Sequence, residues 1–330
     1  FGRTTMREFR EAMAQMAGVE SLILDLSSNG GGLLDQAVEM AGYFLPRQAL
    51  VTYIEGRTIG PEVYRSNAGG EFSGNVVVII DEASASGSEI VAGALQDWDR
   101  AVIVGDDSFG KGLVQRQIPL GDGSAMRLTV ARYHTPSGRV IQRPYEKGHK
   151  DEYYKAHIAR LSGQESDSTQ NALPQYLTLR SRRTVHGGGG IQPDVRVKSD
   201  TTRVSNYMAR MVAQGVYNDF LMEYMDLNRE QLDRMYPSFA EFEREFVLTP
   251  QQLTRLTKVA SERNIEYNES EFNHSKELIL TQLKAMIAQR LYSTCEFYRV
   301  MNPRENAAYK RALEILRAWD EQGAKILAGQ

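Results

Sequence analysis

The chain has 330 residues, of which 42% are hydrophobic and 25% charged, and its formal net charge at pH 7 is -3. This balance is typical of a globular protein of one large or two ordinary domains, and the weak charge argues against nucleic acid as a partner. The single cysteine, Cys295, excludes an internal disulfide bond, and no apolar run reaches the roughly 18 residues of a membrane span.

The first hundred residues alternate between helical and strand patterns. Apolar residues recur at helical spacing over 5–17, where Thr5 is the expected N-cap and Glu8 stands at the capping-box position. The patterns that follow predict, in order, strand 21–26, helix 33–45, strand 50–54, strand 75–80, helix 87–97 and strand 100–105. This alternation indicates an α/β fold, with βαβ crossovers on a mostly parallel sheet that is flanked by helices.

The pattern changes after Phe109. Extended segments joined by the turns GDGS and PSG follow as far as about residue 142, and GGGGIQPDVRV at 187–197 predicts a further strand. Residues 146–184 are polar and poorly periodic, so we expect a polar insert in the core there.

The last part of the chain is almost entirely helical in pattern. One apolar stripe at helical spacing consists of Leu278, Ile279, Leu283, Met286, Ile287 and Leu291. We therefore predict two regions, an α/β core of the catalytic type at 1–199 and an all-helical C-terminal extension at 200–330.

Three serines lie where a predicted buried strand meets a helix, in DEASASGSEIVAGALQD at 81–97. The structural interpretation is that Ser86 and Glu89 form a capping box, because their spacing is S-x-x-E. The catalytic interpretation is that one serine is a nucleophile, because open α/β sheets place their sites at the carboxyl ends of parallel strands.

A serine nucleophile also needs donors for the oxyanion that forms on the substrate carbonyl. The N–H of Gly87 lies in the first turn of the predicted helix, where backbone N–H groups are free. The turn GGG at 30–32 follows another predicted strand, so Gly31 or Gly32 could supply a second donor.

A serine nucleophile further needs a general base, and the residues alone leave two candidates. His134, in ARYHTPSG, is the best placed of the five histidines. Lys111, in SFGKGLVQ, lies between two glycines and beside apolar residues, although such a lysine also fits an ordinary solvated turn. A lysine is protonated at neutral pH, so it acts as a base only where apolar burial favours the neutral amine.

Four ordered blocks of the sequence resemble those of the C-terminal processing peptidases, also called tail-specific proteases. The blocks are LILDLSSNGGGLLDQAVEMAGYFL, SASGSEIVAGALQD, AVIVGDDSFGKGLVQ and PSGRVIQ, and GGGGIQPDVRV resembles the end of that family's core. The resemblance covers about 1–199 and implies a ClpP/crotonase-like peptidase core.

The resemblance also implies the roles of five residues. Ser86 is the nucleophile and Lys111 the general base of a Ser–Lys dyad, and Gln115 orients the lysine. The N–H groups of Gly31 and Gly87 form the oxyanion hole.

Three positions depart from the family's pattern. Ser27 replaces the usual arginine, Gly30 replaces a proline, and Gly87 replaces the common alanine. None of these changes removes a catalytic group, but Ser27 leaves open how the glycine turn is held.

The resemblance implies a serine endopeptidase that cleaves exported proteins near their C-termini. It implies protein substrates with exposed C-termini, a regulatory protein adaptor, and no metal or other cofactor, and the sequence contains no H-E-x-x-H motif. The family carries a PDZ domain before the core, and this chain begins about where such a domain would end. This chain shows no signal peptide, but the resemblance implies a protein of the periplasm or cell envelope.

Two other classes of function stay open at this stage. A silent peptide-binding scaffold of the same family would need neither the serine nor the lysine. An acyl-CoA enzyme of related architecture would share the oxyanion glycines but would not need Lys111.

Overall fold

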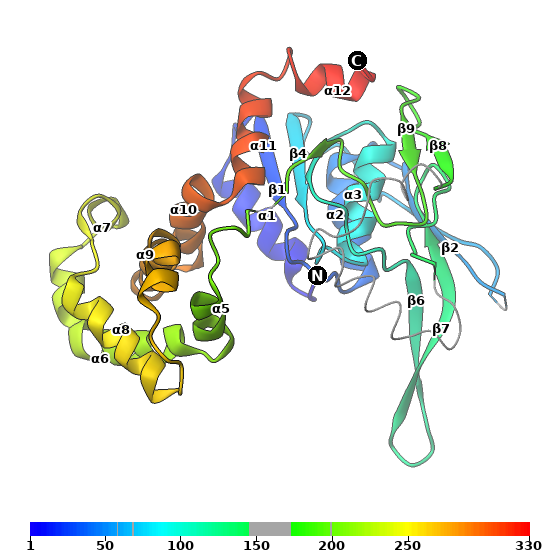
Figure 1. The fold of residues 1–330 in the computed structure, drawn as a ribbon. Helices are drawn as coiled ribbons and strands as arrows, with labels where there is room; N and C mark the ends of the chain where they lie inside the picture. The colour runs from blue at the N-terminus through cyan, green and yellow to red at the C-terminus, as the bar shows by residue number, and fades with distance from the viewer. Residues whose placement is uncertain (58, 68, 145–172, 199) are drawn as a thin grey trace. The chain divides into compact units, whose positions relative to one another are not determined.

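The computed structural model describes residues 1–57, 59–67, 69–144, 173–198 and 200–330 (Figure 1). It divides into two compact units, one formed by Phe1–Lys198 with Arg311–Gln330 and the other by Ser199–Lys310. The first unit therefore includes the last twenty residues of the chain, which the sequence patterns assign to the helical extension.

A four-stranded parallel sheet lies at the centre of the first unit, with the strand order β1-β4-β5-β10. Its strands are β1 (Ser21–Asp25), β4 (Asn75–Ile80), β5 (Val102–Gly105) and β10 (Val195–Arg196). Every residue of β4 from Val76 to Ile80 is buried, as expected for a parallel strand covered on both faces. The strand predicted from GGGGIQPDVRV is confined to β10.

A second, antiparallel sheet has the strand order β3-β2-β7-β6. Its strands are β2 (Leu50–Glu55), β3 (Glu62–Arg65), β6 (Leu113–Pro119) and β7 (Ala125–His134). The strand predicted at 50–54 thus belongs to this sheet and not to the parallel one, because β2 pairs with β7 through Tyr53 and His134. Strand β3 was not predicted. Figure 1 shows β6 and β7 extending as a long hairpin.

Three helices complete the core of the first unit, namely α1 (Thr5–Gln15), α2 (Leu34–Phe44) and α3 (Gly87–Asp97). Helix α3 contacts both β5 and β2, and all of its residues are buried. The predicted capping box of α1 is wrong, because the helix begins at Thr5 itself. The Thr5 hydroxyl oxygen accepts a hydrogen bond from the Gly2 N–H instead.

The predicted fold class is confirmed, because a parallel sheet flanked by helices is followed by a helical region. Most of the polar insert expected at 146–184 lies outside the described residues. Its end carries β8 (Gln175–Leu177), which pairs with β9 (Thr184–His186). Helix α12 (Gly323–Ala328) contacts β5.

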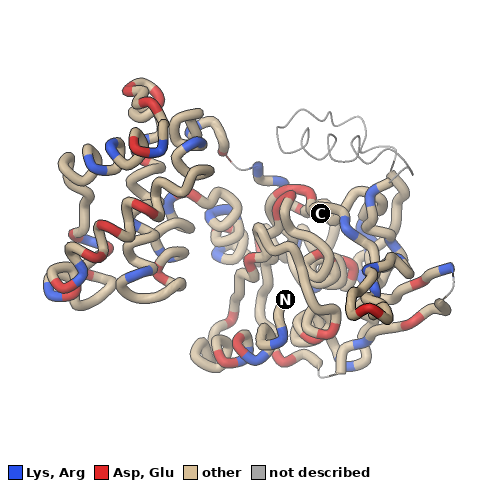
Figure 2. Tube along the Cα trace, turned by 90° about the horizontal axis from the view of Figure 1, so that it is seen from below, with Lys and Arg blue, Asp and Glu red and all other residues tan. Residues whose placement is uncertain are grey.

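The second unit is a bundle of helices around its own apolar core. Its helices are α5 (Asn206–Ala213), α6 (Val216–Met235), α7 (Phe239–Glu245), α8 (Pro250–Glu262), α9 (Glu269–Leu291) and α10 (Thr294–Glu305), and α11 (Ala307–Arg317) continues into the first unit. The predicted stripe is confirmed on α9, where Ile279, Leu283 and Ile287 are fully buried. No helix in the described part of the chain is long and apolar enough to span a membrane. Acidic and basic residues are interspersed along both units (Figure 2).

Candidate active site

Ser86 is the last residue of the turn that joins β4 to α3, and its backbone is strained. Its φ is +55°, a value that residues other than glycine rarely adopt. The side chain is half-buried, and α3 begins at the next residue, Gly87. A strained serine between a buried strand and a helix is the geometry by which hydrolases expose a nucleophilic hydroxyl.

The Glu89 side chain ties Ser86 to the Lys111 loop. Its Oε2 accepts hydrogen bonds from the Ser86 N–H at 2.8 Å and from the Lys111 N–H at 2.9 Å, so the two nitrogens lie at most about 5.7 Å apart, the sum of these distances. Its Oε1 accepts hydrogen bonds from the Ser108 hydroxyl at 2.5 Å and the Gly110 N–H at 2.7 Å. One carboxylate therefore holds together two segments that are 25 positions apart in sequence.

Glu89 is fully buried, and this burial raises the pKa of its carboxyl group above the ordinary value for glutamate. The hydrogen bonds from Ser108, Lys111, Ser86 and Gly110 act in the opposite direction, because they stabilise the charged form. The sequence pattern predicts Glu89 only as a capping residue. Its S-x-x-E spacing predicts the hydrogen bond to Ser86, but no local pattern predicts the hydrogen bond to Lys111.

The glycine turn packs directly against the Ser86 turn. Gly31 has a φ of +87°, and a Cβ atom on it would lie 2.5 Å from the Gly87 nitrogen and 2.5 Å from the Ala85 oxygen. Only glycine allows this approach. The Gly31 N–H donates to Asn29 Oδ1 at 3.0 Å, so it can serve an oxyanion only after it leaves the Asn29 side chain.

The two turns are joined through Asp81, Asn29 and Ser84. The Asp81 carboxylate accepts hydrogen bonds from the Ser28 N–H at 2.8 Å and the Ser84 N–H at 2.9 Å. The Ser84 hydroxyl donates to the Leu26 oxygen at 2.8 Å, and the Ala85 N–H donates to the Asn29 oxygen at 3.0 Å. Asp81 thus holds the turn in which Ser27 replaces the family's arginine.

The Lys111 backbone is fixed, but its side chain is not buried. Lys111 is exposed, so the expected apolar burial of its amine is wrong for this conformation. No hydrogen bond among the described residues joins its amine to the Ser86 hydroxyl. Gln115 is also exposed and lies on β6, paired with Thr129. The backbones of Ser86 and Lys111 are therefore held near each other, but in this conformation their side chains do not form a dyad.

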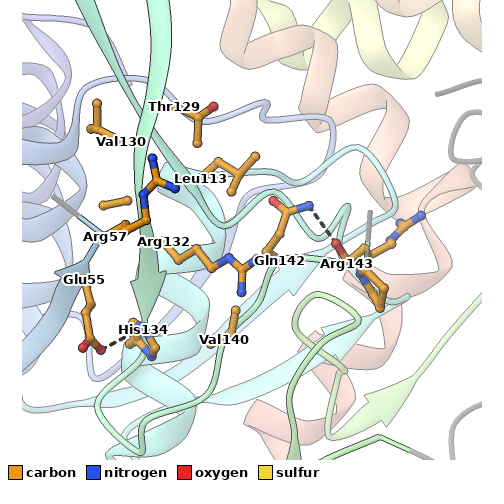
Figure 3. Close-up of a pocket in the computed structure, with 13 residues that line it drawn as sticks. Glu55, Arg57, Leu113, Thr129, Val130, Arg132, His134, Val140, Gln142 and Arg143 are labelled. Atoms are coloured by element: carbon orange, nitrogen blue, oxygen red, sulfur yellow. Dashed lines mark hydrogen bonds and ion pairs between the residues drawn. The ribbon is translucent and has the colours of Figure 1, made fainter. Parts of the chain in front are cut away.

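The rival base, His134, lies on β7. Its ring stacks on Tyr53 at a centroid distance of 4.6 Å, and its Nε2 lies 3.9 Å from a Glu55 oxygen. His134 and Glu55 line a cavity of about 990 Å³, shown in Figure 3. Neither contact links His134 to the Ser86 turn.

The described residues contain no group of three or more His, Cys, Asp or Glu side chains that could hold a metal ion. A strained serine in the turn between a buried parallel strand and a helix is an arrangement typical of hydrolases that transfer acyl groups.

Residues 1–151 match the model of peptidase family S41. The predicted resemblance is thereby confirmed. Residues 207–293 match a model described only as a family of unknown function.

Similar proteins carry matching names. A carboxy-terminal-processing protease of Bartonella bacilliformis is 49% identical over 127 residues, which cover 38% of this chain and 29% of that protein. A carboxyl-terminal-processing protease of Synechocystis is 38% identical over 145 residues, which cover 43% of this chain and 34% of that protein. The chain thus spans about a third of the length of these relatives.

Among solved structures, a photosystem II D1 C-terminal processing protease is 36% identical. The match covers 43% of this chain and 37% of that chain, with a TM-score of 0.39.

Proposed function

We propose that this chain is the core of a serine endopeptidase that cleaves proteins near their C-termini with a Ser–Lys dyad. The observation that carries the proposal is the Glu89 carboxylate, which hydrogen-bonds the backbones of both Ser86 and Lys111. The Lys111 backbone is thereby held close to the Ser86 backbone, which supports the pairing of these two residues in a dyad.

The chemical steps follow from these positions. The Lys111 amine, once it has turned toward Ser86 and lost its proton, accepts the hydroxyl proton as Ser86 Oγ attacks the scissile carbonyl. The N–H groups of Gly31 and Gly87 stabilise the oxyanion, and Gln115 orients the lysine. Lys111 returns the proton to the leaving amine, and water then hydrolyses the ester on Ser86 by the same steps.

The substrates in this proposal are proteins or peptides with exposed C-termini. The names of the relatives support it, since those proteins are called carboxy-terminal processing proteases. A regulatory protein adaptor and a location in the periplasm or cell envelope belong to the same proposal.

The test is cleavage of β-casein, an unfolded protein, followed by mass spectrometry of the products. We expect Ser86→Ala to abolish cleavage, because the nucleophile is removed. Lys111→Ala should also abolish it, and Lys111→Arg should be equally inactive, because a guanidinium does not give up its proton at usable pH. Lys325→Arg, which changes another exposed lysine, is the matched control and should retain full activity.

Each role can fail separately. Activity in Lys111→Arg would transfer the role of base to His134. If the unmodified chain binds β-casein but does not cleave it, the result would favour the alternative function of a peptide-binding scaffold.

A further inference from the structure

A cavity of about 990 Å³ opens on the antiparallel sheet (Figure 3). Its floor is formed by the end of β2 and by residues 129–132 and His134 of β7. Its opposite wall is the segment 140–144, which contributes Val140, Gln142 and Arg143. The cavity is large enough for several residues of an extended peptide.

The wall of this cavity pairs with the loop that carries Lys111. The Gly112 N–H donates to Gln142 Oε1 at 3.0 Å, and the Arg143 N–H donates to the Gly110 oxygen at 3.1 Å. Leu113, two positions after Lys111, lines the cavity itself. A peptide bound in the cavity would therefore run beside the Lys111 loop.

The charged lining of the cavity is mostly basic. Arg57, Arg132 and Arg143 contribute three guanidinium groups, and Glu55 contributes one carboxylate. Arg143 lies over the Phe109 ring, 5.5 Å from its centroid, and Glu55 lies near His134.

The other two guanidinium groups are available to a ligand. Within the described part of the chain, neither Arg57 nor Arg132 forms an ion pair, and both are exposed. Figure 3 shows Arg132 extending across the cavity toward Gln142. Arg132 lies opposite Glu55 in the register of β2 and β7, but the two side chains do not form an ion pair.

We propose that this cavity is a substrate subsite that binds a carboxylate of the peptide through the guanidinium groups of Arg132 and Arg57. A guanidinium is a planar fork of donors that matches a carboxylate in a bidentate manner, which is why it recognises this group well. The carboxylate is either the α-carboxylate at the end of the substrate or an Asp or Glu side chain. The proposal rests on the peptidase function proposed above.

The experiment compares kcat/KM for three peptides of one sequence. The first has a free C-terminus and no acidic residue, the second is its C-terminal amide, and the third is the amide with one Gln replaced by Glu. Preference for the first peptide over the second assigns the α-carboxylate, and preference for the third over the second assigns an acidic side chain.

We expect Arg132→Gln to lower kcat/KM for the preferred carboxylate peptide about tenfold to hundredfold, the usual effect of losing a hydrogen bond between charged groups. Its effect on the neutral amide should stay within about twofold, and Arg57→Gln should behave in the same way. Arg127→Gln removes an exposed arginine of the same strand that does not line the cavity, and it should change neither value.

A binding measurement separates this inference from the proposed function. Fluorescence anisotropy of the labelled peptides on Ser86→Ala reports the subsite without any chemistry. A carboxylate preference in binding that disappears in Ser86→Ala/Arg132→Gln supports the subsite, even if no peptide is cleaved. Equal binding and equal cleavage of all three peptides would overturn the subsite and leave the peptidase function intact.

Discussion

Glu89 shows how one buried side chain can organise a candidate site through hydrogen bonds. A carboxylate has lone pairs for four hydrogen bonds, and here four donors from two segments fill them. The residue therefore acts by positioning Ser86 and the Lys111 loop.

Replacement of Glu89 by Gln tests whether its hydrogen bonds position Ser86 and the Lys111 loop. The amide nitrogen of Gln cannot accept a hydrogen bond, so about two of the four donors would lose their partner, at a cost of roughly 1–3 kcal/mol for each buried group. We expect the free energy of unfolding to fall and kcat on β-casein to drop at least about tenfold. Glu20→Gln, at an exposed position, is the control and should match the unmodified chain in both measurements.

The pH dependence of stability provides a second test of Glu89. Because burial raises its pKa, the folded chain binds the Glu89 proton more tightly than the unfolded chain. Between the ordinary glutamate pKa and the raised value, the folded state thus holds more protons, and the free energy of unfolding decreases as pH rises. Denaturant titrations should show the stability advantage of the unmodified chain over Glu89→Gln shrinking with rising pH in this window. An advantage that grows instead would mean that the hydrogen bonds outweigh burial.

Among the elements, the turns after β1 and β4 behave as one structure. Asn29, Asp81 and Ser84 join them through backbone and side-chain hydrogen bonds. The PSGRVIQ block has a comparable structural role, because the buried Arg139 of that block pairs with Asp97 at the end of α3. These contacts hold both ends of the helix that follows Ser86.

Gly31→Ala tests the contact between the turns. The added Cβ would meet the Gly87 nitrogen and the Ala85 oxygen at 2.5 Å, and the φ of +87° strains any side chain. We expect loss of turnover and a destabilisation of at least about 1–3 kcal/mol, measured by thermal unfolding. Gly30→Ala is a matched control one residue away, since its Cβ would meet nothing within 4 Å. Equal effects of the two substitutions would show that close packing at Gly31 is unimportant.

At the scale of the whole molecule, the two units have separate apolar cores. The helical unit contains its own set of buried residues, which includes Phe220, Phe242, Leu256 and Leu283. A domain of this size normally buries enough apolar surface to fold alone.

A fragment of residues 199–310 should therefore fold on its own. We expect a helical circular dichroism spectrum and a single cooperative thermal transition, because its core does not draw on the first unit. The full-length chain is the reference for the helical signal. A fragment that shows no cooperative transition would contradict the separation of the two cores.

The sequence by itself determined those features that depend on neighbours in the chain. The apolar run at 75–80 specifies a buried strand, and the stripe on α9 specifies a buried helix face, because side-chain periodicity decides which faces can leave water. The position of Ser86 at a strand-to-helix turn was likewise readable from the local pattern.

Only the tertiary structure decided what depends on residues that are distant in sequence. The sequence pattern of β2 does not distinguish it from the strands of the parallel sheet, but its pairing with β7 places it in the antiparallel sheet. The bond from Glu89 to Lys111 and the exposure of the lysine side chain could not be predicted. A local pattern encodes preference and periodicity, whereas hydrogen-bond partners and burial are set by whichever segments the fold brings together.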